Sequence, residues 1–376
     1  MTTQDLPPWT LRIDRPLRQA ARRVQLLRAA TPVNASDERA RLGASFASGN
    51  DGTPHWVYAP LDLEATERAL ADVARELEFH RDGTHRALAA LYAARAAELG
   101  VEAELCRHVG SRELASRGAA RFGPFAAATS VAADALAIAW IGKEGVRTEE
   151  QLLASDSEDR ASLLSRMRAE VGRRRIAFSV VVHAGLPSLA ATGDRAILVA
   201  AGRLISDEAA RRTVVHEIEG HALPRARASV CPLGLVAIGT ARSTDEQEGY
   251  ALVVEHRHGF LTHARRRELA ARHLAVRAMR GGASFVETVR MLVREHGVRV
   301  TDAIVIAERT YRGSDGTFAG LGRERVYLEA FVRVRDRLAI EPAVEQTLSA
   351  GQVSLDAVAT LAPYLASWHP APDLKA

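Results

Sequence analysis

Two histidines and a glutamate lie within six residues of one another, in the pattern His216-Glu217-Ile-Glu-Gly-His221. Neutral imidazole nitrogens bind Zn²⁺ well, and an adjacent carboxylate can accept a proton from a water molecule at the metal. These residue types therefore predict a divalent metal site in which Glu217 is the general base. The alternative is a helix end that carries two incidental histidines.

The spacing of the two histidines is unusual for a metal site on a helix. In the familiar pattern HExxH the histidines lie four residues apart, which is about one helical turn. Here they lie five residues apart, so an ideal α-helix would separate the rings by roughly 140° around its axis. Gly220 favours a local change of geometry. We therefore predict either an i→i+5 bulge between His216 and His221 or a helix end at Gly220.

The segments around this motif predict the elements that position it. Two β-branched runs, residues 176–182 and 195–200, predict an antiparallel pair of strands. Ser206 or Asp207 is expected to cap the helix that carries His216. Most of the remaining chain shows helical periodicity interrupted by Gly and Pro. The sequence thus predicts a predominantly helical α+β fold with a small antiparallel sheet beside the metal-binding helix.

The length of 376 residues suits one large domain or two modest ones. The change from helical to β-branched patterning near residue 170 suggests three regions. These are an N-terminal helical region (1–170), a catalytic region (171–340) and a C-terminal helical tail (341–376), which we expect to form one compact unit.

The composition argues against several classes of partner. Only Lys143 and Lys375 are lysines, so arginine supplies nearly all of the 50 basic residues, and 46 acidic residues leave a net charge of +4. This balance does not favour nucleic-acid binding. No apolar run reaches the length of a membrane span, and the N-terminus does not resemble a signal peptide. Two cysteines suggest a reducing compartment. We expect a cytoplasmic protein that binds neither nucleic acid nor membrane.

A catalytic metal site needs a third protein ligand. Ser243-Thr-Asp-Glu246 has the pattern of a capping box, which predicts a helix that starts there. Glu248 lies in the first turns of this helix, where its carboxylate can be aimed rigidly. Glu255 lies roughly 10 Å further along the axis, so orienting a histidine or forming a structural ion pair suits it better. The other candidates are Asp245, Glu246, His256 and His258.

Three motifs in this order resemble a known family. They are His-Glu-Ile-Glu-Gly-His (216–221), Asp-Glu-Gln-Glu-Gly-Tyr-Ala (245–251) and Glu-Arg-Thr-Tyr-Arg-Gly (308–313). Together with 326–329 and, more loosely, 56–60, they resemble the DUF1704 family over roughly residues 30–360. Its members are also called QEGLA-motif (flavohemoglobin expression-modulating) proteins, and the microtubule-associated tyrosine carboxypeptidases belong to it.

The resemblance implies a zincin-like metallopeptidase with one Zn²⁺. In the family, both histidines of HExxxH and the glutamate of QEGLA bind zinc, and the glutamate of HExxxH is the base. Carried over, the ligands are His216, His221 and Glu248, and the base is Glu217. The chain departs from the family pattern at Glu219-Gly220, at Tyr250 and at Ser314-Asp315, and none of these changes removes a ligand.

The function that follows is a zinc metallopeptidase that removes a C-terminal aromatic or apolar residue from a peptide or protein. A carboxypeptidase must hold a terminal carboxylate, and Arg309 and Arg312 suit this bidentate contact. The alternative for both is an ion pair with nearby acids. Tyr250, Tyr311, Tyr327 or an arginine could stabilise the oxyanion. Two other functions stay open: a metal-binding regulatory protein without hydrolytic activity, and a metallohydrolase that acts on a small amide.

Overall fold

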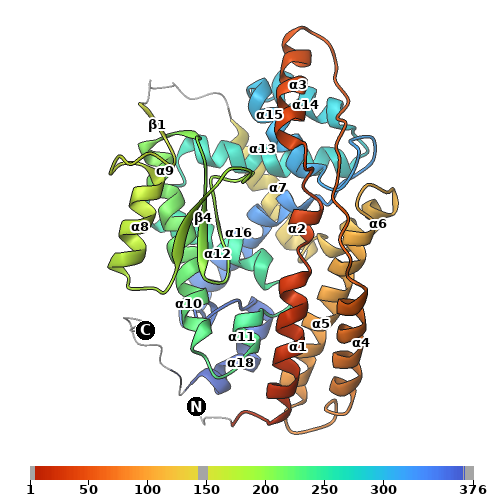
Figure 1. Ribbon diagram of the computed structural model, residues 1–376, viewed down its shortest axis with the longest axis vertical. Coiled ribbons are helices and arrows are strands. Elements are labelled where there is room, and N and C mark those ends of the chain that lie inside the picture. The colour runs from red at the N-terminus through yellow and green to blue at the C-terminus, as the bar shows by residue number, and fades with distance from the viewer. Residues whose placement is uncertain (1–4, 143–150, 367, 369–376) are drawn as a thin grey trace. The chain divides into compact units, whose positions relative to one another are not determined.

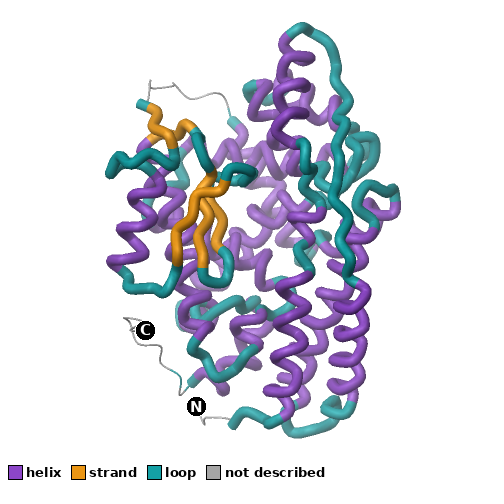
Figure 2. The backbone as a smooth tube through the Cα atoms, viewed as in Figure 1, coloured by secondary structure: helices purple, strands orange, loops and turns teal. Residues whose placement is uncertain are grey.

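The structure is a computed structural model that describes residues 5–142, 151–366 and 368. Helices account for most of these residues, and the strands form two small sheets (Figure 2). The predicted α+β class with a helical majority is therefore confirmed. No helix within the described ranges is both long enough and apolar enough to span a membrane.

The chain divides into two compact units, each assembled from segments that are distant in sequence. The first unit comprises Met1–Asp14, Val146–Thr262 and Arg333–Ala376, and the second comprises Arg15–Gly145 and His263–Val332. The division falls within two helices, α1 (Trp9–Arg23) and α16 (Val326–Ile340). The units thus interleave along the chain.

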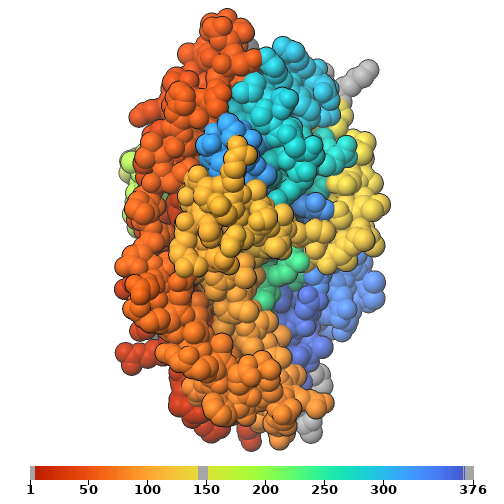
Figure 3. Space-filling model, turned by 90° about the vertical axis from the view of Figure 1, so that its right-hand side faces the viewer, coloured from red at the N-terminus to blue at the C-terminus, as the bar shows by residue number. Residues whose placement is uncertain are grey.

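The second unit consists of helices and loops in its described part. Helix α7 packs along α13, α4 along α5, and α14 along α15. Figure 3 shows α7, in yellow, at the surface beside the cyan segment that follows His263. The bounds of its helices are α2 (Leu26–Ala29), α3 (Ala35–Ala47), α4 (Glu64–Glu78), α5 (Arg86–Arg107), α6 (Glu113–Arg121), α7 (Ala127–Ile141), α13 (His263–Arg280), α14 (Phe285–Arg294), α15 (Val300–Thr310) and the 3₁₀ turn η2 (Arg323–Arg325).

The first unit contains both sheets. Strands β2 (Ser179–His183), β4 (Ala196–Ala200) and β3 (Ala190–Thr192) form a three-stranded sheet in the order β2-β4-β3. Strands β1 (Leu152–Ala154) and β5 (Leu204–Ser206) form a separate antiparallel pair. The predicted strands are present, but the prediction that they pair antiparallel is wrong, because β2 and β4 run parallel.

A short third strand is the physical reason for this parallel pairing. Strand β3 is antiparallel to β4 and is joined to it by a tight turn, in which Gly193 N–H donates to the carbonyl of Ala196 at 2.8 Å. Residues 184–189 therefore carry the chain from the end of β2 past β4 to the far edge of the sheet. The chain then returns through β4 in the same direction as β2.

Helices of the first unit cover this sheet and enclose a common core. Leu163 and Met167 of α8 (Leu163–Arg173), Ile197 of β4 and Ile218 are fully buried in one apolar cluster. Figure 1 shows α8, α9 and β4 close together in this part of the molecule. The unit's other helices are α9 (Asp207–Val215), η1 (His216–Ala222), α10 (Leu223–Ser229), α11 (Leu235–Ile238), α12 (Ser243–Arg257), α17 (Val344–Leu348), η3 (Leu355–Ala357) and α18 (Val358–Leu365).

Candidate metal centre

The helix that carries the two histidines changes its geometry where the motif begins. Ser206 caps α9 by accepting a hydrogen bond from the backbone N–H of Ala209, which confirms one of the two predicted caps. From His216 to Ala222 the helix is a π-helix, η1, and α10 follows it directly. Because i→i+5 bonding places residues five apart one turn above each other, both rings lie on one side. The predicted bulge is confirmed.

Gly220 permits a very close approach between η1 and α12. A Cβ atom at Gly220 would lie 2.5 Å from Cβ and 2.9 Å from Cα of Ala251, which is closer than real Cβ contacts. Ala251 lies one helical turn after Glu248 on α12. The close packing therefore brings the helix with the third candidate ligand against the helix with the histidines.

The start of α12 differs from the predicted capping box. Arg242, in a left-handed conformation with φ of 60°, is the N-cap, and Ser243 is the first helical residue. Glu246 does not bond back to the helix start. It is buried at 1% exposure, pairs with Arg333 at 3.0 Å and accepts a hydrogen bond from the backbone N–H of Leu355. Tertiary contacts thus replace the local cap.

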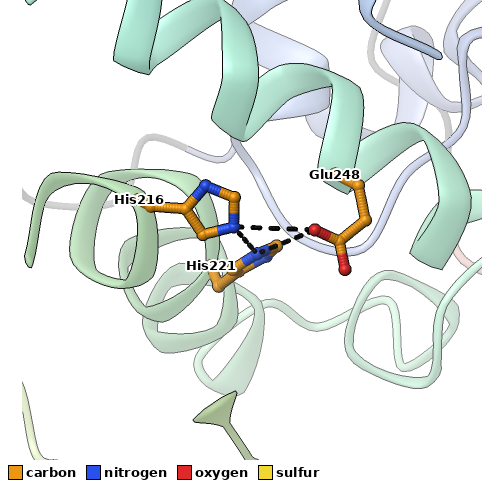
Figure 4. A group of neighbouring side chains, drawn as sticks. All are labelled: His216, His221 and Glu248. Atoms are coloured by element: carbon orange, nitrogen blue, oxygen red, sulfur yellow. Dashed lines mark hydrogen bonds and ion pairs between the residues drawn. The ribbon is translucent and has the colours of Figure 1, made fainter. Parts of the chain in front are cut away.

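The side chains of His216, His221 and Glu248 converge on one point (Figure 4). The Nε2 atoms of the two rings lie 3.2 Å apart. Oε2 of Glu248 lies 3.5 Å from Nε2 of His216 and 3.8 Å from Nε2 of His221. Donor atoms around a tetrahedral Zn²⁺ sit roughly 3.3–3.5 Å from one another, given bonds of about 2.0–2.2 Å. The three residues therefore have the donor types and spacing that fit one such ion.

The charge around this point also favours a cation. The carboxylates of Glu217, Glu248 and Glu255 surround the two imidazoles. Burial favours the neutral ring of His216, but hydrogen bonds to Glu248 and Glu255 outweigh it and raise the pKa of His216 to about 10. Without a metal ion the carboxylates thus hold a proton on this ring. A divalent cation among the same groups would offset the negative charge of the carboxylates more fully than one proton does.

Glu255 fixes the orientation of His216. Its Oε1 atom lies 2.6 Å from Nδ1 of the ring, and its side chain is fully buried. Since an ionised carboxylate only accepts hydrogen bonds, Nδ1–H is the donor, and in the neutral ring that a metal ion requires, Nε2 would present its lone pair to the ion. Glu255 therefore orients His216 through this hydrogen bond. This is one of the two roles that the position of Glu255 along the helix predicts.

Glu217 is buried beside the three candidate ligands. One carboxylate oxygen accepts a hydrogen bond of 2.7 Å from the hydroxyl of Thr192, at the end of β3. Burial, together with the charge of Glu248, raises the pKa of Glu217 above its usual value, although the charge of His216, the Thr192 hydroxyl and the charge of Arg225 oppose this shift. A carboxylate held in one orientation and partly desolvated is suited to accepting a proton.

Tyr250, on α12, contacts the carboxylate of Glu345. Its hydroxyl donates to Oε1 of Glu345 at 3.2 Å, and Arg257 pairs with the same carboxylate. Burial and the charge of Glu345 raise the pKa of Tyr250.

The other predicted substrate-binding residues belong to the second unit. Arg309 pairs with Glu324 at 3.0 Å, and Arg312 lies 3.9 Å from the same carboxylate oxygen. The guanidinium groups of Arg272 and Arg323 lie over the ring of Tyr327, at 5.4 Å and 5.7 Å from its centroid.

Tyr311 is fully buried in the second unit. Its hydroxyl lies 3.0 Å from the hydroxyl of Thr288 and donates to the carbonyl of Ala283. Burial raises its pKa to about 12. Each of these predicted residues thus has a partner within its own unit.

Sequence reasoning missed two residues that act on Glu217, namely Thr192 through a hydrogen bond and Arg225 through its charge. Thr192 belongs to the short run Ala190–Thr192, which shows no strand pattern of its own. Arg225 follows His221 by four residues on α10, and that spacing places it one turn further along the helix. The spacing was a usable signal for Arg225, whereas nothing local marks Thr192.

The comparison with known families agrees with this geometry. The family model described as microtubule-associated tyrosine carboxypeptidase matches residues 44–367. The chain therefore belongs to the microtubule-associated tyrosine carboxypeptidase family, which confirms the resemblance carried by the three motifs. Membership supports an enzyme of the carboxypeptidase class. Among curated proteins, none matches the chain.

Proposed function

We propose that this chain is a zinc-dependent carboxypeptidase with His216, His221 and Glu248 as metal ligands and Glu217 as general base. The observation that carries the proposal is the convergence of the three donor atoms beside the buried Glu217 carboxylate. Family membership supports the reaction class. The helix with the histidines packs on a small sheet, and we propose that this arrangement is zincin-like.

The roles of the residues follow from their contacts. A bound zinc ion would polarise the scissile carbonyl and make a nearby water more acidic. Glu217 would accept the proton of that water as it attacks, and would then pass the proton to the departing amine. The Thr192 hydroxyl holds one oxygen of Glu217, so the other oxygen is left to face the water. Glu255 keeps Nε2 of His216 directed at the ligand set.

The family's description names a tyrosine carboxypeptidase. We therefore propose that the residue removed from the peptide or protein is aromatic, with other large apolar residues as poorer substrates. A free C-terminal carboxylate would be the feature that separates end-trimming from internal cleavage.

Two measurements test this proposal. The purified protein should contain about one zinc per chain, and His221→Ala and Glu248→Ala should each lose it. Mass spectrometry should show that a peptide with a free C-terminal tyrosine is shortened by one residue, while its C-terminal amide is not. Full zinc in both variants would refute the ligand assignment.

The same peptides decide between the alternatives. Equal cleavage of the acid and the amide, or cuts at internal bonds only, would indicate an endopeptidase or an amidase. A zinc-containing protein that cleaves neither peptides nor small amides would favour a regulatory metal-binding protein.

A further inference from the structure

Arg225 is a cation of the first unit that interacts electrostatically with Glu217 and Glu248 of the candidate metal centre. It follows His221 by one helical turn, on α10, which continues the π-helix without a break. Its side chain is only 19% exposed. Burial lowers the pKa of Arg225, while the charges of Asp194, Glu217 and Glu248 oppose this effect. Arg225 thus lies within electrostatic reach of both the proposed base and a proposed ligand.

The internal partners of Arg225 leave much of its hydrogen-bonding capacity unused. Its ion pair with Asp194 is long, at 3.6 Å, and the Asp194 side chain is 54% exposed. Its Nε–H is buried and has no hydrogen-bond partner among the described residues. A buried donor without a partner costs free energy, so a guanidinium in this state is suited to an incoming acceptor.

A carboxylate is the acceptor that matches a guanidinium best. The planar fork of N–H groups can bind both carboxylate oxygens at once. The carboxylates of Glu217 and Glu248 would be engaged by the proton transfer and by the metal, so neither is available to complete this fork. In a carboxypeptidase the substrate brings a carboxylate of its own, one residue beyond the bond that is cut.

We propose that Arg225 binds the terminal carboxylate of the substrate and so sets the preference for a free C-terminus. This inference rests on the proposed carboxypeptidase function. It places the carboxylate contact on the same helical segment as the histidines and the base. The distance between the scissile bond and the carboxylate contact is then fixed by one rigid element.

The arginines predicted from the sequence are less suited to this role. Arg309 is already paired with Glu324 at 3.0 Å, and Arg312 shares that fully buried carboxylate. Breaking a buried ion pair to bind a substrate is costly, because the partner charge is left uncompensated. The contact between Arg225 and Asp194 is looser and lies nearer to solvent, so exchanging it costs less.

Direct binding measurements test the proposal without relying on turnover. All variants are made in zinc-loaded Glu217→Gln protein, and calorimetry measures the affinity for a peptide ending in tyrosine and for its C-terminal amide. Arg225→Gln should weaken binding of the acid by about 30-fold or more and leave binding of the amide within about twofold. The affinity of Arg225→Lys for the acid should lie between those of the parent protein and Arg225→Gln, because an ammonium group keeps the charge but lacks the planar fork of N–H donors.

Asp194→Asn is the matched control. If Arg225 only ties α10 to the turn after β3, Asp194→Asn and Arg225→Gln should lose similar stability, and neither should change the ratio of acid to amide affinity. If Arg225 binds substrate, Asp194→Asn should bind the acid at least as tightly as the parent protein, because a competing carboxylate has been removed. Zinc content and thermal unfolding verify that each variant is folded.

The possible failures are distinguishable. If the ratio of acid to amide affinity is unchanged in Arg225→Gln and Arg225→Lys, the role of Arg225 is overturned. Removal of the C-terminal residue by the wild-type protein would in that case still support the proposed function. A ratio that changes in Arg312→Lys but not in Arg225→Lys overturns the role of Arg225 and assigns the carboxylate contact to Arg312. If the wild-type protein neither trims the acid nor prefers it to the amide, the proposed function fails and this inference fails with it.

Discussion

Gly220 and Ala251 approach so closely that a side chain at position 220 would lie 2.5 Å from the Cβ atom of Ala251. The contact joins two of the three family motifs, because Gly220 lies between the histidines and Ala251 follows Glu248 by three residues. A small residue at each position lets the two helix backbones come together. The spacing of the candidate ligands therefore depends on two residues that have no metal-binding atoms.

Gly220→Ala should destabilise the protein and weaken metal binding. Alanine is the better helix former by about 1 kcal/mol, but overpacking costs about 1–3 kcal/mol, and here the obstacle includes backbone. We expect a net loss in the free energy of unfolding, measured by denaturant titration, together with reduced zinc content.

A second substitution at the same contact provides the control for this result. The double variant Gly220→Ala with Ala251→Gly should recover part of the loss, because the glycine makes room for the new methyl group. Additive effects of the two changes would show that the contact does not set the helix spacing.

Glu217→Gln should retain zinc and fold but lose about 10²- to 10⁴-fold in turnover, because an amide cannot accept the proton of the attacking water. Glu219→Gln is the matched control two residues away, since Glu219 instead contacts Arg174 and His258. Steady-state kinetics on a tyrosine-ending peptide should separate the two variants. Similar rates for Glu217→Gln and the wild-type protein would remove Glu217 from the mechanism.

Glu255→Gln should lower the affinity for zinc by about 10- to 100-fold, because a neutral amide holds the Nδ1–H group of His216 less strongly. Competition with a chelator of known affinity measures this change. His256→Gln, at an exposed neighbouring position, serves as the control and should bind zinc like the wild-type protein. An affinity that is equal in both variants would mean that the 2.6 Å contact does not support the metal.

Glu246 should make stability depend on pH. Its burial raises its pKa to about 7, although the charge of Arg333 opposes this. The folded state then binds a proton more tightly than the unfolded chain, so this stabilising contribution is complete below about pH 4.5 and is lost as the pH rises through 7. The free energy of unfolding of the wild-type protein, relative to that of Glu246→Gln, should therefore decrease as the pH is raised from 5 to 8, by at most about 3 kcal/mol.

Denaturant titrations of both proteins at pH 5, 6.5 and 8 measure this difference. A stability difference that stays constant, or that grows with pH, would show that Glu246 remains ionised in the fold because its ion pair with Arg333 dominates over burial.

The features that sequence could predict are those fixed by neighbours along the chain. The spacing of His216 and His221 predicted the departure from α-helical geometry, because five residues and one shared ion are incompatible with a regular helix. The Ser206 cap also follows from local pattern. Residue types alone marked Glu217 as the candidate base, and motif order indicated the family.

The features that sequence could not predict depend on distant segments. The parallel pairing of β2 and β4 results from β3, whose short Ala-Ala-Thr run has no strand signature. The capping-box pattern at Ser243 fails because Glu246 is drawn into a buried pair with Arg333. Thr192 reaches Glu217 only because β3 packs beside η1. In each case tertiary contacts outweigh a weaker local preference.

The π-helix from His216 to Ala222 is equivalent to an α-helix that has accepted one extra residue. Deleting that residue would return the histidines to a separation of four, which a regular α-helix again places on one face. Insertion or deletion of a single residue between the ligands, together with conversion between the two helix types, would thus leave the geometry at the ion nearly unchanged. A sequence motif that requires one fixed spacing between the histidines will therefore assign proteins with similar metal centres to different groups.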